Sequence, residues 1–134
     1  MAMLSKMIGD CLVVRSVGDH DLELGFSQML EAMEKARAHF EASGKRPVMY
    51  LDMLESEEDR DASEIRHIND FFKQFLDFLD GRIAVMVDKQ LYFGLARVFS
   101  ALAETSGLDV RPFYEGKEAL AFIGVTDLDL SGGV

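Results

Sequence analysis

Two short stretches of this sequence carry residue types that could bind a ligand. The first is the junction "VDKQ", where Asp88 and Lys89 separate an apolar run from a helix-like pattern. The second is "DMLESEEDRDASE", which places seven carboxylates between Asp52 and Glu64. Both stretches follow predicted strands, so they lie at the carboxyl edge of a parallel sheet, where open α/β folds bind ligands. Asp52, Asp88 and Lys89 are therefore a candidate site for a small polar ligand. The alternative, which the sequence favours, is that Asp88 caps the following helix and Lys89 is solvated.

The acidic stretch could also surround a hard cation, because calcium and magnesium prefer carboxylate oxygens. It lacks the spacing and the central glycine of an EF-hand loop. Acidic residues also favour the first turns of a helix through the helix dipole. The pattern therefore favours a solvated acidic loop, and we predict no metal site there.

Recognisable catalytic and cofactor signatures are missing from the sequence. His20, His39 and His67 form no HxxxH or HExxH spacing. Cys11 has no sequence-adjacent histidine, and no serine lies in a G-x-S-x-G elbow. The segment "GKEAL" at 116–120 lacks the spacing of a P-loop, and no GxGxxG occurs. We therefore expect a protein that is not an enzyme and that binds no cofactor.

The composition is that of an ordinary globular domain. Hydrophobic residues make up 49% of the 134 residues and charged residues 28%, enough for one domain with a substantial core. The lone Cys11 stands in an apolar run, which is typical of a reduced, buried thiol and predicts a cytoplasmic protein.

Charge and hydropathy exclude two classes of partner. The net charge of -10 repels phosphate backbones and anionic lipid surfaces at long range. No apolar stretch approaches the roughly 20 residues of a bilayer span, and the N-terminal "MAMLSKMIGD" lacks the apolar core of a secretion signal. We therefore predict no nucleic-acid partner and no membrane partner.

The apolar spacing predicts strands that alternate with helices. Strand-like runs lie at about 3–8, 11–17, 47–54, 82–87 and 108–114. Helical stripes extend from Leu22 to Phe40, from Ile65 to Leu79 and from Tyr92 to Ala103, and a short helix is expected at about 116–124. This order predicts an α/β domain, ββαβαβαβα, with a mostly parallel five-stranded sheet and an antiparallel leading hairpin. We assign 1–124 to this domain and expect 125–134 to be a frayed tail.

Several residues indicate where these elements start, end or lie in the sheet. Asp21 can cap the first helix and Gly44 can end it, and Asp61 and Glu64 have the spacing of a capping box for the second. The continuous apolar run "RIAVMV" predicts a strand buried on both faces. Pro112 predicts that the last strand lies at a sheet edge, because proline cannot donate to a ladder.

The last 55 or so residues resemble a known family. The strand at 82–87, the helix "YFGLARVFSALAE" and the closing "DVRPFYEGKEALAFI" are similar to SpoIIAA-like proteins, which are relatives of the STAS anti-sigma-factor-antagonist domains. This resemblance implies the same α/β fold and a regulatory binding module. STAS relatives are controlled by phosphorylation of a serine at a helix start. Ser63, in "DRDASEIRHI", is the position that could correspond, and the alternative is an ordinary helix-start serine, which its acidic neighbours favour.

Surplus apolar residues flank the second and third helical stripes. They are Phe71, Phe78, Leu91, Phe93 and Val98. Adjacent helices could cover these side chains, or the side chains could form a protein interface or the mouth of an apolar pocket. We predict a non-catalytic regulatory module that binds a protein partner, itself included as a homodimer. The alternative is a small-molecule or lipid-like ligand carrier or sensor with an apolar pocket between the helices and the sheet.

Overall fold

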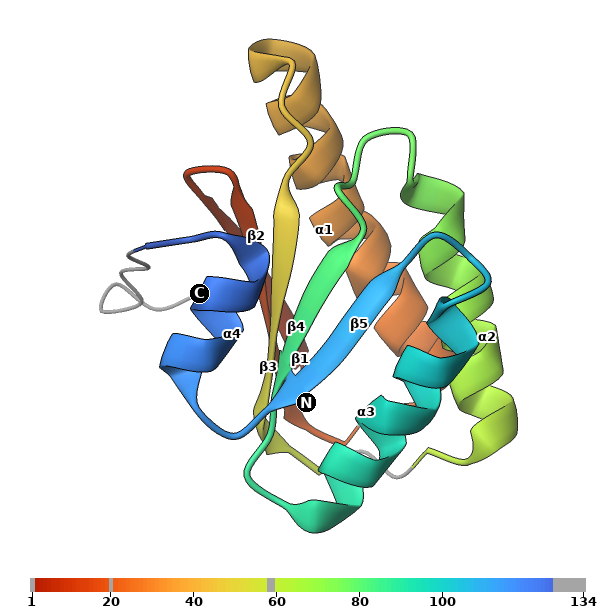
Figure 1. Ribbon diagram of the computed structural model, residues 1–134. Coiled ribbons are helices and arrows are strands. Elements are labelled where there is room, and N and C mark those ends of the chain that lie inside the picture. Colours follow the sequence, from red (N-terminus) through yellow and green to blue (C-terminus); the bar gives the residue numbers. More distant parts are fainter. Residues whose placement is uncertain (1, 20, 58–59, 127–134) are drawn as a thin grey trace.

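The computed structural model describes residues 2–19, 21–57 and 60–126 (Figure 1). Within these ranges the chain forms five strands and four α-helices. The strands are β1 (Ala2–Ile8), β2 (Cys11–Gly18), β3 (Val48–Ser56), β4 (Arg82–Met86) and β5 (Asp109–Phe113). The helices are α1 (Leu22–Ser43), α2 (Ala62–Phe72), α3 (Gln90–Ala103) and α4 (Gly116–Ile123), with a 3₁₀ turn at Lys73–Phe75. The element order is the predicted one.

The strands form a single mixed sheet in the order β1-β2-β3-β4-β5. β1 and β2 pair antiparallel as a hairpin, and the remaining neighbours pair in parallel. β4 is an interior strand, and its residues Ile83, Ala84, Val85 and Met86 are all buried. β5 lies at the edge, as Pro112 predicts. The expected α/β fold with a leading antiparallel hairpin is confirmed.

Helices cover the two faces of the sheet unequally (Figure 1). α1, α2 and α3 cover one face, where the larger hydrophobic cluster lies. α4 covers the other face, where a smaller cluster surrounds Cys11, Tyr50 and Ile123. None of the helices in the described ranges is long and apolar enough to span a bilayer. The predicted frayed tail at 125–134 lies almost entirely outside the described residues.

Three of the predicted helix ends are confirmed, and the predicted end of the second helix is wrong. The Asp21 side chain accepts a hydrogen bond from Leu24 N, and Gly44 ends α1 with a left-handed φ of 73°. The capping box of Asp61 and Glu64 is present at the start of α2. The second helix was expected to continue to Leu79, but α2 ends at Phe72. The tighter turns that follow direct Phe75, Phe78 and Leu79 into the core, where all three are buried.

Candidate functional site

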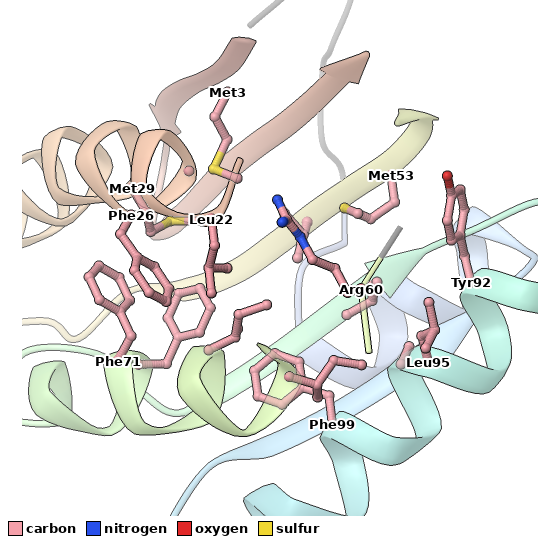
Figure 2. Close-up of a pocket in the computed structure, with 17 residues that line it drawn as sticks. Met3, Leu22, Phe26, Met29, Met53, Arg60, Phe71, Tyr92, Leu95 and Phe99 are labelled. Atoms are coloured by element: carbon pink, nitrogen blue, oxygen red, sulfur yellow. The ribbon is translucent and has the colours of Figure 1, made fainter. Parts of the chain in front are cut away.

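A pocket of about 110 Å³ lies between the three-helix layer and the sheet (Figure 2). Its floor is formed by side chains of the central strands, including Leu51 of β3 and Val85 of β4. Its walls come from β1 and from α1, α2 and α3. The lining is Met3, Leu22, Gly25, Phe26, Met29, Leu51, Met53, Arg60, Ile65, Ile68, Phe71, Phe72, Val85, Tyr92, Leu95, Ala96 and Phe99. Almost all of this surface is hydrocarbon, aromatic ring or thioether.

The pocket exists because α2 is packed differently from its neighbours. Backbone contacts join α1 to β1 and β2, and α3 to β5, whereas α2 packs mainly against α3. Large side chains of α2 therefore fill the space above the central strands. Phe71 stacks on Phe26 of α1 with ring centroids 4.6 Å apart, and Phe72 stacks on Phe99 of α3 at 5.9 Å. These stacked rings border a gap that no described side chain fills.

Arg60 brings a charge to this apolar lining. It precedes Asp61, the N-cap residue of α2, and its side chain is 11% exposed. Its Nη1 lies 3.2 Å from Oε2 of Glu64. The other carboxylate oxygen of Glu64 accepts a hydrogen bond from the backbone N of Asp61 at 3.3 Å. The capping box therefore fixes the carboxylate that holds the guanidinium at the pocket (Figure 2).

Tyr92 adds a phenol to the same lining from the first turn of α3, and 8% of the residue is exposed. The Nζ of Lys89 lies 5.2 Å from the centre of its ring, within the range of a cation–π contact. One residue of the predicted polar site thus contacts a residue that lines the pocket. Lys89 itself is exposed.

Asp52 and Asp88 do not join Lys89 in one site. Asp52 is not at the end of its strand, because β3 continues to Ser56. It alternates with Val48 and Tyr50 and so faces α4, on the opposite side of the sheet from α3. There its Oδ2 lies 3.4 Å from Nε of Arg15, and its Oδ1 accepts from Leu54 N at 2.9 Å.

Asp88 was expected to cap α3, and this expectation is wrong. The N-cap residue is Lys89, with extended backbone angles, and no side chain caps the helix. β4 ends at Met86, so Asp88 falls one residue before the cap position and its side chain is exposed in the connection. The pocket lies toward the carboxyl edge expected for the site, but other residues line it.

The five surplus apolar residues divide into two groups. Phe78 is 6% exposed, with the guanidinium of Arg37 5.1 Å from its ring, and Phe71 packs inside the aromatic cluster. Phe78 therefore cannot form an exposed interface, whereas Phe71 stays partly exposed. Phe93 stacks on Tyr114 at 4.6 Å, while Leu91 is 61% and Val98 39% exposed. The α3 group is the more exposed of the two.

The remaining candidate residues have ordinary surroundings. Ser63 is exposed in the first turn of α2. Nε2 of His39 lies 2.8 Å from Oδ1 of Asp10, and His67 is exposed. His20 and two of the acidic residues, at 58 and 59, lie outside the described residues. In the described part of the chain, no group of three His, Cys, Asp or Glu side chains could hold a metal ion.

Cys11 is fully buried beneath α4. Burial raises the pKa of its thiol to about 12, and a backbone hydrogen bond involving Tyr50 opposes this shift. Burial also raises the pKa of the Tyr50 phenol, with smaller contributions from the charges of Asp52 and Cys11. Because a thiol must ionise to act as a nucleophile, this burial disfavours nucleophilic chemistry at Cys11.

Sequence reasoning missed Arg60 as a lining residue. The lining comes from seven segments of the chain, and no local pattern records how their side chains meet. One signal was available, because Arg60 is the only basic residue in the acidic stretch 52–64. The apolar excess on the second helix was a second signal, since Phe71 belongs both to that excess and to the lining.

Comparisons with known proteins identify the fold. No protein-family model matches the sequence, and no curated protein sequence matches it either. Among solved structures, the chain is similar to an uncharacterized protein of the DUF3478 family with a SpoIIAA-like fold, from Shewanella loihica PV-4. The TM-score is 0.59 at 20% sequence identity, over 91% of this chain and 92% of the other. At this identity the similarity concerns architecture alone. The protein therefore has the SpoIIAA-like fold.

Proposed function

We propose that this protein binds a small apolar or amphipathic molecule in the pocket below α2. The observation that supports this function is the unfilled apolar space of about 110 Å³ in an otherwise packed layer. Protein interiors rarely leave voids larger than a water molecule. The apolar walls of this space would otherwise contact water, so a bound apolar group would gain the free energy of removing that surface from water.

The size of the space limits the buried part of the ligand. A dry apolar cavity of about 150 Å³ is large enough to bind benzene. The pocket is somewhat smaller, so it fits one aromatic ring or a short alkyl chain. Met3, Met29 and Met53 line it, and flexible thioether side chains adapt to ligands of different shape.

Binding, rather than catalysis, suits the chemistry of the lining. Among the described lining residues there is no carboxylate, histidine or thiol, so the pocket offers no ordinary general base or nucleophile. The function is therefore that of a non-catalytic carrier or sensor.

A pocket-filling variant tests this function. Ala96 lines the pocket on α3, and Ala96→Leu would place three more carbons in the empty space. Ala101 is exposed on the same helix, so Ala101→Leu is the matched control. Benzene at ten times its dissociation constant should raise the melting temperature of the wild type by about 3–5 °C. Ala101→Leu should keep that response, and Ala96→Leu should lose it. An unresponsive wild type, or an equal response in Ala96→Leu, would contradict the function.

A second observation favours self-association as an additional function. α3 contains no Asp or Glu among its 14 residues, in a chain with 24 acidic residues. Leu91 and Val98 are exposed on it, each about one helical turn from Leu95. Two chains of net charge -10 repel each other least where they meet through a helix without carboxylates. We therefore propose a homodimer that is joined through α3.

Light scattering at micromolar concentration tests the dimer. The wild type should show a mass near twice 15.0 kDa. Leu91→Glu should give a monomer, because it adds a charge at the centre of the contact. Leu24→Glu on α1 changes a leucine that is also exposed and should leave the dimer intact. A wild type that stays monomeric would contradict the dimer without affecting the pocket.

A further inference from the structure

We propose that the ligand of the pocket is a small carboxylic acid, whose carboxylate binds the guanidinium of Arg60. This inference rests on the proposed function, since it assigns a chemical class to the ligand of the same pocket. Arg60 is the only residue with a formal charge among the described residues of the lining, and its side chain is 11% exposed. An apolar site with one convergent charged group is the usual arrangement of a pocket that orients an amphipathic ligand.

The guanidinium is held in position before a ligand arrives. Glu64 contacts Nη1 of Arg60 through one oxygen and the backbone N of Asp61 through the other. The carboxylate of Glu64 is therefore anchored to the start of α2 by the capping box. Such preorganisation reduces the entropy that binding would otherwise cost.

Carboxylate is the head group that this geometry favours. A guanidinium presents its N–H donors in a planar fork that matches the two oxygens of a carboxylate. In the structure the carboxylate of Glu64 contacts Nη1 of Arg60. A ligand carboxylate would approach the guanidinium from the pocket side, so that both carboxylates share the same cation. An amine would instead be repelled by Arg60. A neutral amide would accept a hydrogen bond without the gain from opposite charge.

The volume of the pocket limits the size of the apolar part of the ligand. The space of about 110 Å³ admits one ring or a short branched chain, with the head group outside it at Arg60. Tyr92 also belongs to the lining, so its ring adds to the wall around the apolar body. The class is therefore a small aromatic or short-chain carboxylic acid, rather than a long fatty acid.

Three ligands with the same body and different head groups provide the test. They are phenylacetate, phenylacetamide and phenethylamine, titrated into the purified protein with NMR chemical shifts as the readout. An ionic strength of 0.15 M limits the reach of the acidic stretch to about 8 Å. The acid should bind the wild type about tenfold more tightly than the amide, because its hydrogen bonds to Arg60 are charge-assisted. The amine should bind most weakly.

Variants of Arg60 test whether its guanidinium causes the preference for the acid over the amide. Arg60→Met keeps an apolar side chain and removes the charge, so the preference for acid over amide should fall below about twofold while amide affinity is kept. Arg60→Lys keeps a charge without the planar fork and should give an intermediate preference. Arg66 is exposed on α2 and outside the lining, so Arg66→Met should behave as the wild type.

Each contrary result has a distinct meaning. Equal binding of acid and amide to the wild type, or tightest binding of the amine, would overturn the inference and leave the pocket function standing. Retention of the acid preference in Arg60→Met would overturn it as well. If the wild type binds none of the three ligands and no benzene, the inference and the proposed function both fail.

Discussion

Helices cover the two faces of the sheet in different ways. On the α4 face, Cys11, Tyr50, Ala84 and Ile123 are each at most 7% exposed beneath one short helix. On the other face three helices cover the strands, and the central one packs mainly against α3 rather than on the strands. The single short helix α4 leaves little room for gaps on its face. On the other face, the large aromatic rings of α2 bridge a wider space above the strands and leave a gap. The pocket therefore results from helix placement and not from a local motif.

The largest expected difference between the faces is the cost of the same core truncation. Ile123 and Ile65 are 2% and 4% exposed, on the α4 face and in the pocket lining respectively. Ile123→Ala should cost about 4 kcal/mol, because it opens a cavity in packed surroundings. Ile65→Ala should cost about 2 kcal/mol, because one side of Ile65 already borders empty space. Urea unfolding measures both, and an equal cost would remove the distinction between the faces.

Asp52 and Asp88 provide the next contrast. Asp52→Ala should cost about 2 kcal/mol, because it leaves Arg15 without its carboxylate and Leu54 N without its acceptor. The partial exposure of Arg15 keeps the cost below that of a fully buried pair. Asp88→Ala should change stability by less than about 0.5 kcal/mol, because its side chain caps no helix. A loss of about 1 kcal/mol in Asp88→Ala would restore the expected cap.

Much of the fold could be predicted because its signals are local. The capping box at Asp61 and Glu64 is recorded within four residues, and the buried strand "RIAVMV" within six. The site could not be predicted in the same way. The meeting of Phe26 with Phe71 and the place of Arg60 in the lining depend on how α2 packs between its neighbours.

Errors in the sequence predictions have physical causes of the same kind. Phe78 was a candidate interface residue because helical spacing was extended beyond Phe72. The 3₁₀ turn then rotates Phe78 into the core. Asp52 was placed at a strand end, but β3 continues for four residues beyond it, to Ser56. In both cases tertiary packing decided where a regular element ends.

Burial of Cys11 on the α4 face should also make the folded protein less stable at alkaline pH. In the folded protein, burial raises the pKa of the Cys11 thiol from its ordinary value of 9.0 to about 12. Above pH 9 the folded chain therefore binds more protons than the unfolded chain, so stability is lost as the pH rises from about 9 to about 12. The raised pKa of Tyr50 acts in the same direction. Urea unfolding of Cys11→Ala should show a shallower pH dependence across this window, and an unchanged slope would argue against a buried thiol.

The smallest expected effect is that of Ser63→Asp. Ser63 is exposed in the first turn of α2, where a carboxylate is weakly favourable to the helix dipole. Stability should change by less than about 0.5 kcal/mol, and benzene binding should be unaffected because Ser63 is not part of the lining. Loss of binding by a folded Ser63→Asp would indicate that this position controls the pocket.

The most direct measurement of ligand binding uses the methionines as reporters. Met3, Met29 and Met53 line the pocket, whereas Met86 is buried on the α4 face. In NMR spectra of protein labelled with ¹³C at the methionine methyls, benzene should shift the signals of the three lining residues. The signal of Met86 should stay in place. Unchanged lining signals at saturating benzene, or equal shifts at Met86, would contradict a ligand pocket below α2.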